Sequence, residues 1–157
     1  MLVGVYDMSS FGSPARCYGK TYIASGGNTE LIDADTWYQI DGAAYSSTIC
    51  YYFHQTDASS AMQYRRLSPR RVYLRATISA SSNKADNFHF GFARNGAVIS
   101  DSCIDRQINA LGEKASVSII WTLCLYNNDI VSIVVKSTVQ NNATLTTDHG
   151  VFVATSI

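Results

Sequence analysis

The amino-acid sequence predicts an all-β domain, and three features of its composition carry that prediction. The chain of 157 residues contains 31 serine and threonine residues and 10 tyrosines, which are typical of strands and turns. Strong helix formers are scarce, since glutamate occurs twice, lysine four times and leucine eight times. Charged residues make up 15% of the chain against about 25% in an average protein, while apolar residues make up 46%. This balance allows a buried core and argues against a helical bundle or an α/β fold.

The N-terminal half shows short strand-like runs that are separated by turn residues. Residues 21–25 form the first run and end at Gly26-Gly27, and residues 37–41 and 48–55 form the next two. Residues 71–80 are the clearest case, because Val72 and its alternate neighbours are apolar while Arg71 and its alternate neighbours are polar. A period of two is expected for a strand with one buried face.

The middle of the chain predicts a β-hairpin. Residues 87–94 place three phenylalanines on one face of a strand and His89 on the other. This run leads directly into Asn95-Gly96, which precedes the apolar residues 97–99. Asparagine and glycine both tolerate a positive φ, so the pair is a strong signal for a tight hairpin turn.

The C-terminal part predicts further antiparallel strands at residues 115–126, 130–139, 144–146 and 151–157. Residues 103–111 fit either a strand or an irregular crossing segment closed by Gly112. In total we expect about eight to ten strands at spacings typical of a sandwich, a jelly roll or a barrel. We find no repeat and no linker, so residues 20–157 are expected to form one domain.

Residues 1–19 are expected to form an N-terminal arm. Glycine, serine and proline break regular structure there, yet Val5, Tyr6, Phe11 and Tyr18 are apolar or aromatic. A free tail rarely carries so many such groups. The arm therefore packs either on its own domain or on a partner subunit.

The charges balance overall but are unevenly distributed. Twelve basic and twelve acidic residues give a formal net charge of zero, which argues against a nucleic-acid partner. Residues 63–75, however, hold five arginines and no acid. These arginines form either a solvated face or a patch that docks on an acidic surface, such as the acidic segment 30–41 of a neighbour, with a nucleic-acid contact as a minor option.

Nothing in the sequence indicates an enzyme, a metal site, a cofactor or a membrane span. His54, His89 and His149 lack metal-ligand spacing and catalytic context, so we expect structural roles for them. Asp33 and Asp35 are expected in a solvated turn. The four cysteines allow three disulfide pairings, and without a signal peptide we favour free thiols in a reducing compartment.

The stretch from Phe88 to Ile157 carries a resemblance to a known family. Its aromatic strand leads into Asn95-Gly96, an interval closes near Gly112, and a long strand ends in the run Leu-Tyr-Asn-Asn-Asp-Ile-Val at residues 125–131. This pattern resembles the jelly-roll trimers of the complement and tumour-necrosis-factor type, with Asn128-Asp129 where that family has Gly-Asp. It is also similar to small bacteriophage structural proteins, such as capsid decoration proteins and tail-fibre tips.

The resemblance implies an antiparallel jelly roll that forms a homotrimer in a virion. We expect a capsid decoration (cement) protein that binds the major capsid protein on the capsid surface after assembly in the host cytoplasm. The alternative is the receptor-binding tip of a tail fibre, which would recognise a host glycan or protein. The candidate capsid-binding residues are Val5, Tyr6, Phe11, Tyr18, Arg65, Arg66, Arg70, Arg71 and Arg75. Phe88, Phe90, Phe92, Trp121 and Phe152 are assigned to the core or, as the candidate trimer interface, to a threefold axis.

Overall fold

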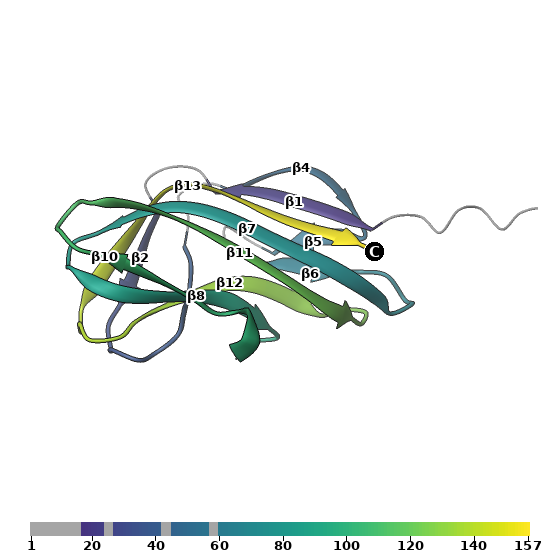
Figure 1. The fold of residues 1–157 in the computed structure, drawn as a ribbon. Coiled ribbons are helices and arrows are strands. Elements are labelled where there is room, and N and C mark those ends of the chain that lie inside the picture. The colour runs from purple at the N-terminus through teal and green to yellow at the C-terminus, as the bar shows by residue number, and fades with distance from the viewer. Residues whose placement is uncertain (1–16, 24–26, 42–44, 57–59) are drawn as a thin grey trace, which may run out of the picture.

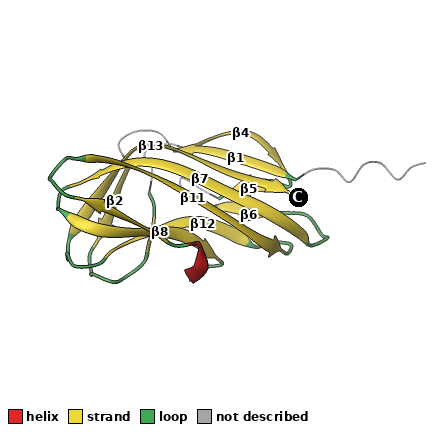
Figure 2. Cartoon of the chain, in the orientation of Figure 1, coloured by secondary structure: helices red, strands yellow, loops and turns green. Residues whose placement is uncertain are grey.

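Two antiparallel sheets pack face to face in the computed structural model, which describes residues 17–23, 27–41, 45–56 and 60–157 (Figures 1 and 2). Sheet A contains β1 (Tyr18–Ile23), β2 (Gly27–Leu31), β4 (Tyr45–Tyr51), β7 (Arg70–Ser82), β11 (Lys114–Leu125) and β13 (Ala143–Ser156). Sheet B contains β3 (Tyr38–Gln39), β5 (Phe53–Gln55), β6 (Met62–Tyr64), β8 (Asp86–Arg94), β9 (Ala97–Val98), β10 (Ile104–Ile108) and β12 (Ile130–Ser137). A single 3-10 turn, η2 (Ser100–Ser102), is drawn in red in Figure 2 and is the one helical element of the described residues.

The strand order is that of a jelly roll. Sheet A runs β11-β7-β13-β1-β4, with β2 pairing the first half of β13, and sheet B runs β10-β8-β12-β6-β5. From β10 onward, successive strands alternate between the sheets, so that β10 and β12 lie in sheet B while β11 and β13 lie in sheet A. The predicted all-β antiparallel fold is confirmed.

Local sequence accounts for the strand and turn positions. In β7 the apolar residues Val72, Leu74 and Ile78 are fully buried, while the alternate positions face outward. Asn95 and Gly96 have φ values of 51° and 80°, which gives the tight turn that the hairpin requires. Both expectations from the sequence are confirmed.

The structure differs from the sequence prediction at several element boundaries. The two runs predicted at 144–146 and 151–157 form one long strand, β13, which ends at Ser156, because a bulge between Thr147 and His149 absorbs the break in the alternation. Segment 103–111 contains the strand β10. Short strands of two or three residues raise the count in the described residues to 13, above the eight to ten expected. β1 begins at Tyr18, so the sheet starts two residues before the predicted domain boundary, and residues 1–16 of the arm lie outside the described residues.

The aromatic residues proposed for a trimer interface lie in the core instead. Phe88, Phe92 and Phe152 are fully buried between the sheets, and Phe90 is 2% exposed. Their side chains fill the space between sheets A and B, so they have no surface to offer a neighbour. Trp121 is half-buried at the margin of the same core. The core alternative is therefore correct, and the assignment of these four phenylalanines to a threefold axis is wrong.

Candidate interaction surface

The outer face of sheet A is built from four adjacent strands whose outward residues align in rows. The register between the strands places the outward residues of β1, β13, β7 and β11 side by side across the sheet. We call this surface the sheet A face and define it by three rows: Tyr18, Thr155, Tyr73 and Thr122; Lys20, Val153, Arg75 and Ile120; Tyr22, Val151, Thr77 and Ser118. Aromatic rings, aliphatic side chains and two cations thus share one surface.

The sheet A face is open to solvent in the described part of the chain. Ile120 is 52% exposed, and Arg75 and Thr77 are exposed as well. Val151 and Val153 are half-buried beside them. An exposed apolar surface that is rimmed by polar groups is a common mark of an interaction site.

A shallow hollow of about 280 Å³ lies in the middle of this face. Val151 and Val153 line it together with Tyr18, Thr77 and the two cations, Lys20 and Arg75. The Lys20 ammonium lies 4.5 Å from the centroid of the Tyr22 ring. Its interaction with the Tyr22 side chain raises the pKa of Lys20, so the amine stays charged at neutral pH.

The cations of this face have no acidic partner within the described residues. Neither Lys20 nor Arg75 takes part in any of the four ion pairs found there. On the sheet B side, two exposed acids are each paired with a basic side chain. His89 Nδ1 lies 2.7 Å from Asp105 Oδ1, and Lys136 Nζ lies 2.8 Å from Asp35 Oδ1. The sheet A face therefore combines apolar area with positive charge that an acidic partner could neutralise.

The candidate capsid-binding residues do not gather in one patch. Tyr18, Arg71 and Arg75 lie on sheet A and point outward. Arg65 and Arg66 lie in the connection between β6 and β7, and Arg70 opens β7. Val5, Tyr6 and Phe11 lie outside the described residues.

The arginine connection has a structural contact of its own. Arg66 Nη1 donates to Cys17 Sγ at 3.6 Å, and its guanidinium lies 5.0 Å from the centroid of the Tyr52 ring. The Tyr64 hydroxyl donates to the Ser68 carbonyl at 2.9 Å. Burial raises the pKa of Tyr64 to about 12, so the phenol stays neutral. This end of the sandwich is thus held by buried polar contacts.

A second hollow, of about 330 Å³, lies beside the start of β8. Asn87, Gln107, Asn109 and Gln140 are among the residues that line it. Asp86 also lines it, but its carboxylate accepts hydrogen bonds from the Ser137 hydroxyl and from the backbone N–H groups of Asn87, Val139 and Gln140. Burial disfavours the charged carboxylate, but these hydrogen bonds outweigh it and lower the pKa of Asp86. Asp86 is therefore a structural anion.

The remaining candidates from the sequence are dispersed. His54 and His149 are exposed on separate strands, and Asp33 and Asp35 lie in the loop between β2 and β3, as expected. The described residues contain no group of three or more histidine, cysteine, aspartate or glutamate side chains that could hold a metal ion. Cys17, Cys103 and Cys124 are free thiols. Within the described ranges, no helix has the length and apolar character that a bilayer span would need.

Known proteins resemble this chain in fold. No protein-family model and no curated protein matches it. The structure of Eiger TNF from S. frugiperda matches with a TM-score of 0.58 at 9% identity, over 90% of this chain and 93% of that one. The globular domain of zebrafish complement 1qA matches with a TM-score of 0.53 at 11% identity, over 90% and 97%. PRD1 vertex protein P5 matches with a TM-score of 0.52 at 10% identity, over 89% and 95%. The chain thus has the jelly-roll fold of tumour-necrosis-factor and C1q domains.

Sequence reasoning identified only part of the sheet A face. It placed Arg71, Arg75 and Tyr73 on the outward side of one strand, which is correct. It missed Tyr22, Ile120, Val151 and Val153, because their neighbours in the sheet come from other strands. Ile120 interrupts an otherwise polar outward face on β11, and that irregularity was the one available signal.

Proposed function

We propose that this chain is a homotrimeric structural protein of a virus particle, which decorates the capsid by binding the major capsid protein. The observation that carries the proposal is the sheet A face, an outward surface with apolar area and with two cations, Lys20 and Arg75, that have no acidic partner among the described residues. The proposal includes no catalytic activity and no cofactor. It places the protein on the capsid surface after assembly in the host cytoplasm.

Self-association is supported by the chemistry of the sheet A face. Ile120, Val151 and Val153 bring aliphatic groups to the surface of one sheet, and Tyr18 and Tyr73 bring aromatic rings. Tyrosine and arginine are enriched where proteins bind one another. The formal net charge of zero also leaves little repulsion between copies.

The capsid role is supported by two further observations. A vertex protein, PRD1 P5, is among the proteins that share the fold. The exposed arginines Arg65 and Arg71 remain available at one end of the sandwich for an acidic surface. Binding that is repeated over many copies would stabilise the shell by mass action, even when each contact is weak.

The second hollow supports a different role, that of a receptor-binding fibre tip. The side chains of Asn87, Gln107, Asn109 and Gln140 offer amide donors and acceptors at its rim. Amides suit the hydroxyl groups of a neutral glycan, because each can donate and accept at once. In this second candidate function the chain recognises a host-surface glycan.

The solution mass of the full chain tests the proposed assembly. Light scattering at micromolar concentration should give about three times 17.2 kDa. Val153→Asp and Ile120→Asp should reduce the mass to that of a monomer, because each buries a charge in the interface. Val139→Asp is the control, since Val139 is 71% exposed in the turn that follows β12. A wild-type monomer would contradict the trimer.

Binding assays separate the two roles. A decoration protein should co-sediment with purified expanded capsids, and deletion of residues 1–16 or the Arg65→Glu and Arg71→Glu changes should weaken that binding. A fibre tip should instead bind host cells and lose that binding with Gln107→Ala and Asn87→Ala. Binding to cells without binding to capsids would replace the first role with the second.

A further inference from the structure

We infer that Asp101 of a neighbouring copy binds between Lys20 and Arg75 on the sheet A face. The inference rests on the homotrimer proposed above and names the charged contact that joins its subunits. It concerns three residues of this chain: a pair of cations on one surface and an acid on the edge of the sandwich. Each step below uses the contacts of a single chain.

Lys20 and Arg75 are placed to hold one carboxylate together. Lys20 pairs with Val153, and Val153 pairs with Arg75, so the two cations flank one valine on the same face of the sheet. Adjacent strands lie about 4.8 Å apart, which puts their Cα atoms roughly 10 Å from each other. Both side chains are long enough to converge over Val153. The hollow of about 280 Å³ that they line has room for a carboxylate and its stem.

Tyr18 and Thr77 line the same hollow, and each carries a hydroxyl group. They add hydrogen-bond donors to two positive charges, around a floor formed by Val151 and Val153. Such a set recognises an anion on a partly apolar stem, which describes the side chain of an aspartate or glutamate. The described part of this chain supplies no acid to Lys20 or Arg75.

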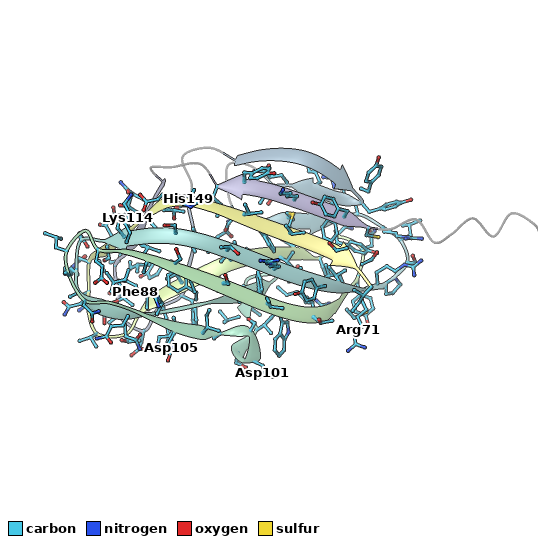
Figure 3. The ribbon with its side chains drawn as sticks, turned by 45° about the horizontal axis from the view of Figure 1, so that its top comes forward. Arg71, Phe88, Asp101, Asp105, Lys114 and His149 are labelled. Carbon is cyan, nitrogen blue, oxygen red and sulfur yellow. The ribbon has the colours of Figure 1, made fainter. Side chains whose placement is uncertain are left out.

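Asp101 is an exposed acid without a cationic partner among the described residues. It lies in η2, where its carboxylate accepts a hydrogen bond from the Ser100 hydroxyl at 3.3 Å and enters no ion pair. The turn lies against β11, the edge strand of sheet A. Figure 3 shows Asp101 projecting from the lower margin of the sandwich, beyond β11. The edge that carries Asp101 can therefore contact the sheet A face of another copy.

We infer from a chain of contacts that Asp101 lies near the level of the cations along the strands. Its neighbour Ser102 accepts a hydrogen bond from the Phe92 N–H at 2.9 Å. The Phe92 ring stacks on Phe152 with centroids 5.4 Å apart, and Phe152 lies between the two valines of the hollow. These contacts run directly across the sandwich from η2 to the hollow.

Rotational symmetry can bring residues at the same height along the axis into contact. The inferred trimer has its rotation axis parallel to the long strands. Such a rotation moves each residue around the axis and leaves its height along the axis unchanged. Lys20 and Arg75 of one copy therefore meet residues at the same height on the next copy, as in any heterologous ring. Asp101 satisfies that condition.

Three other exposed acids fit less well. Asp105 is already paired with His89 at 2.7 Å. Asp33 and Asp35 belong to a loop at one end of the sandwich, where Asp35 N–H donates to the Ser137 carbonyl at 2.8 Å. The acidic segment 30–41, which the sequence offered as a partner for the arginines, is thus at a different height from Lys20 and Arg75.

Charge reversal in a double-mutant cycle tests the inference. Trimer dissociation is measured by sedimentation for the wild type, for Arg75→Glu, for Asp101→Arg, and for the chain with both changes. Each single change should weaken the trimer at least about tenfold, because it places like charges together. The combined change should recover most of that loss, since it restores the pair with its signs exchanged. Circular dichroism checks that every variant is folded.

Two matched controls separate this contact from general charge effects. Asp33→Arg reverses an exposed acid at the end of the sandwich, and Arg65→Glu reverses an exposed cation in a connection. Both should leave trimer dissociation unchanged. If the wild type is trimeric and the double change shows no recovery, the inferred pairing is wrong while the trimer stands. If the wild type is a monomer, both the pairing and the proposed trimer are overturned.

Discussion

Phe92 of β8 and Phe152 of β13 stack across the two sheets, with ring centroids 5.4 Å apart and an interplanar angle of 27°. The pair joins sheet B to sheet A at the centre of the core, and both side chains are fully buried. The chain neighbours of Phe152, Val151 and Val153, lie on the sheet A face, whereas the Phe92 backbone N–H donates to the Ser102 hydroxyl of η2. This aromatic contact therefore links the η2 turn to the sheet A face through the core.

Truncation of this pair should cost much of the stability of the domain. Phe152→Ala should lower the free energy of unfolding by about 3–5 kcal/mol, because it removes a buried ring and leaves a cavity between the sheets. Urea denaturation followed by tryptophan fluorescence measures the change. Leu67→Ala is the control, since Leu67 is 88% exposed and should change stability by less than about 0.5 kcal/mol. Equal costs at both sites would contradict the packing described above.

Gly19 should not accept a larger side chain. A Cβ atom at this position would lie 2.8 Å from Phe53 Cβ and 3.0 Å from Met62 Sδ. Gly19→Ala should therefore destabilise the domain by about 1–3 kcal/mol, because β1 would be pushed away from the strands of sheet B. Thermal unfolding of this variant beside Ser81→Ala, at a half-buried outward position of β7, measures the difference. A Gly19→Ala protein as stable as the wild type would show that the two sheets are less closely packed here.

Stability should fall in acid because two buried aspartates are stabilised as anions. The hydrogen bonds to Asp86 lower its pKa against the cost of burial. Burial likewise opposes the charge on Asp129, but the Tyr126 N–H, the Asn95 amide and Arg94 lower its pKa. A depressed pKa in the folded state adds stability above the unfolded value of about 3.9, and that stability is lost as the pH falls through the lower folded value. Urea midpoints should therefore decrease from about pH 5 downward.

Asp86→Asn separates this effect from general acid denaturation. At neutral pH the variant should lose about 2 kcal/mol of stability, because an amide cannot accept from all the donors that surround Asp86. Its stability should also depend less on pH in the acidic range than that of the wild type. Asp33→Asn is the matched control, since Asp33 is exposed and enters no ion pair among the described residues. Parallel pH curves for the wild type and Asp86→Asn would refute the role given to this carboxylate.

The hairpin turn should require glycine at one position. Gly96 has a φ of 80° and no heavy atom within 4 Å of an added Cβ, so backbone strain rather than a clash limits substitution. Gly96→Val should cost about 1–2 kcal/mol, which is the penalty for a left-handed backbone with a side chain. Ala97→Val, one residue later at an exposed strand position, should be neutral. Chemical denaturation of the two variants compares them directly, and a neutral Gly96→Val would exclude the turn strain.

The sequence predicted the strands and turns that are specified by residues close together in the chain. Alternation along residues 71–80 and 87–94 predicted β7 and β8, and Asn95-Gly96 predicted the turn that follows. It did not predict that residues 144–146 and 151–157 join in one strand, because a bulge at His149 shifts the alternation. The strands β2 and β6 were also missed, because each is too short to carry a clear periodic signal. Their pairing depends on neighbours that are distant in the sequence.

By itself, the sequence determined the fold class of this protein and the positions of its main strands, because composition, period and turn residues act within a few residues of one another. The tertiary structure alone decided which side chains from different strands lie together. It buried Phe88, Phe90, Phe92 and Phe152 between the sheets, and it brought Lys20, Val153 and Arg75 together from three strands. When strand pairing brings residues of distant segments together on one surface, no pattern along the sequence reveals that surface. The physical reason is that hydrogen bonding between strands, and not spacing along one of them, sets which side chains share a face.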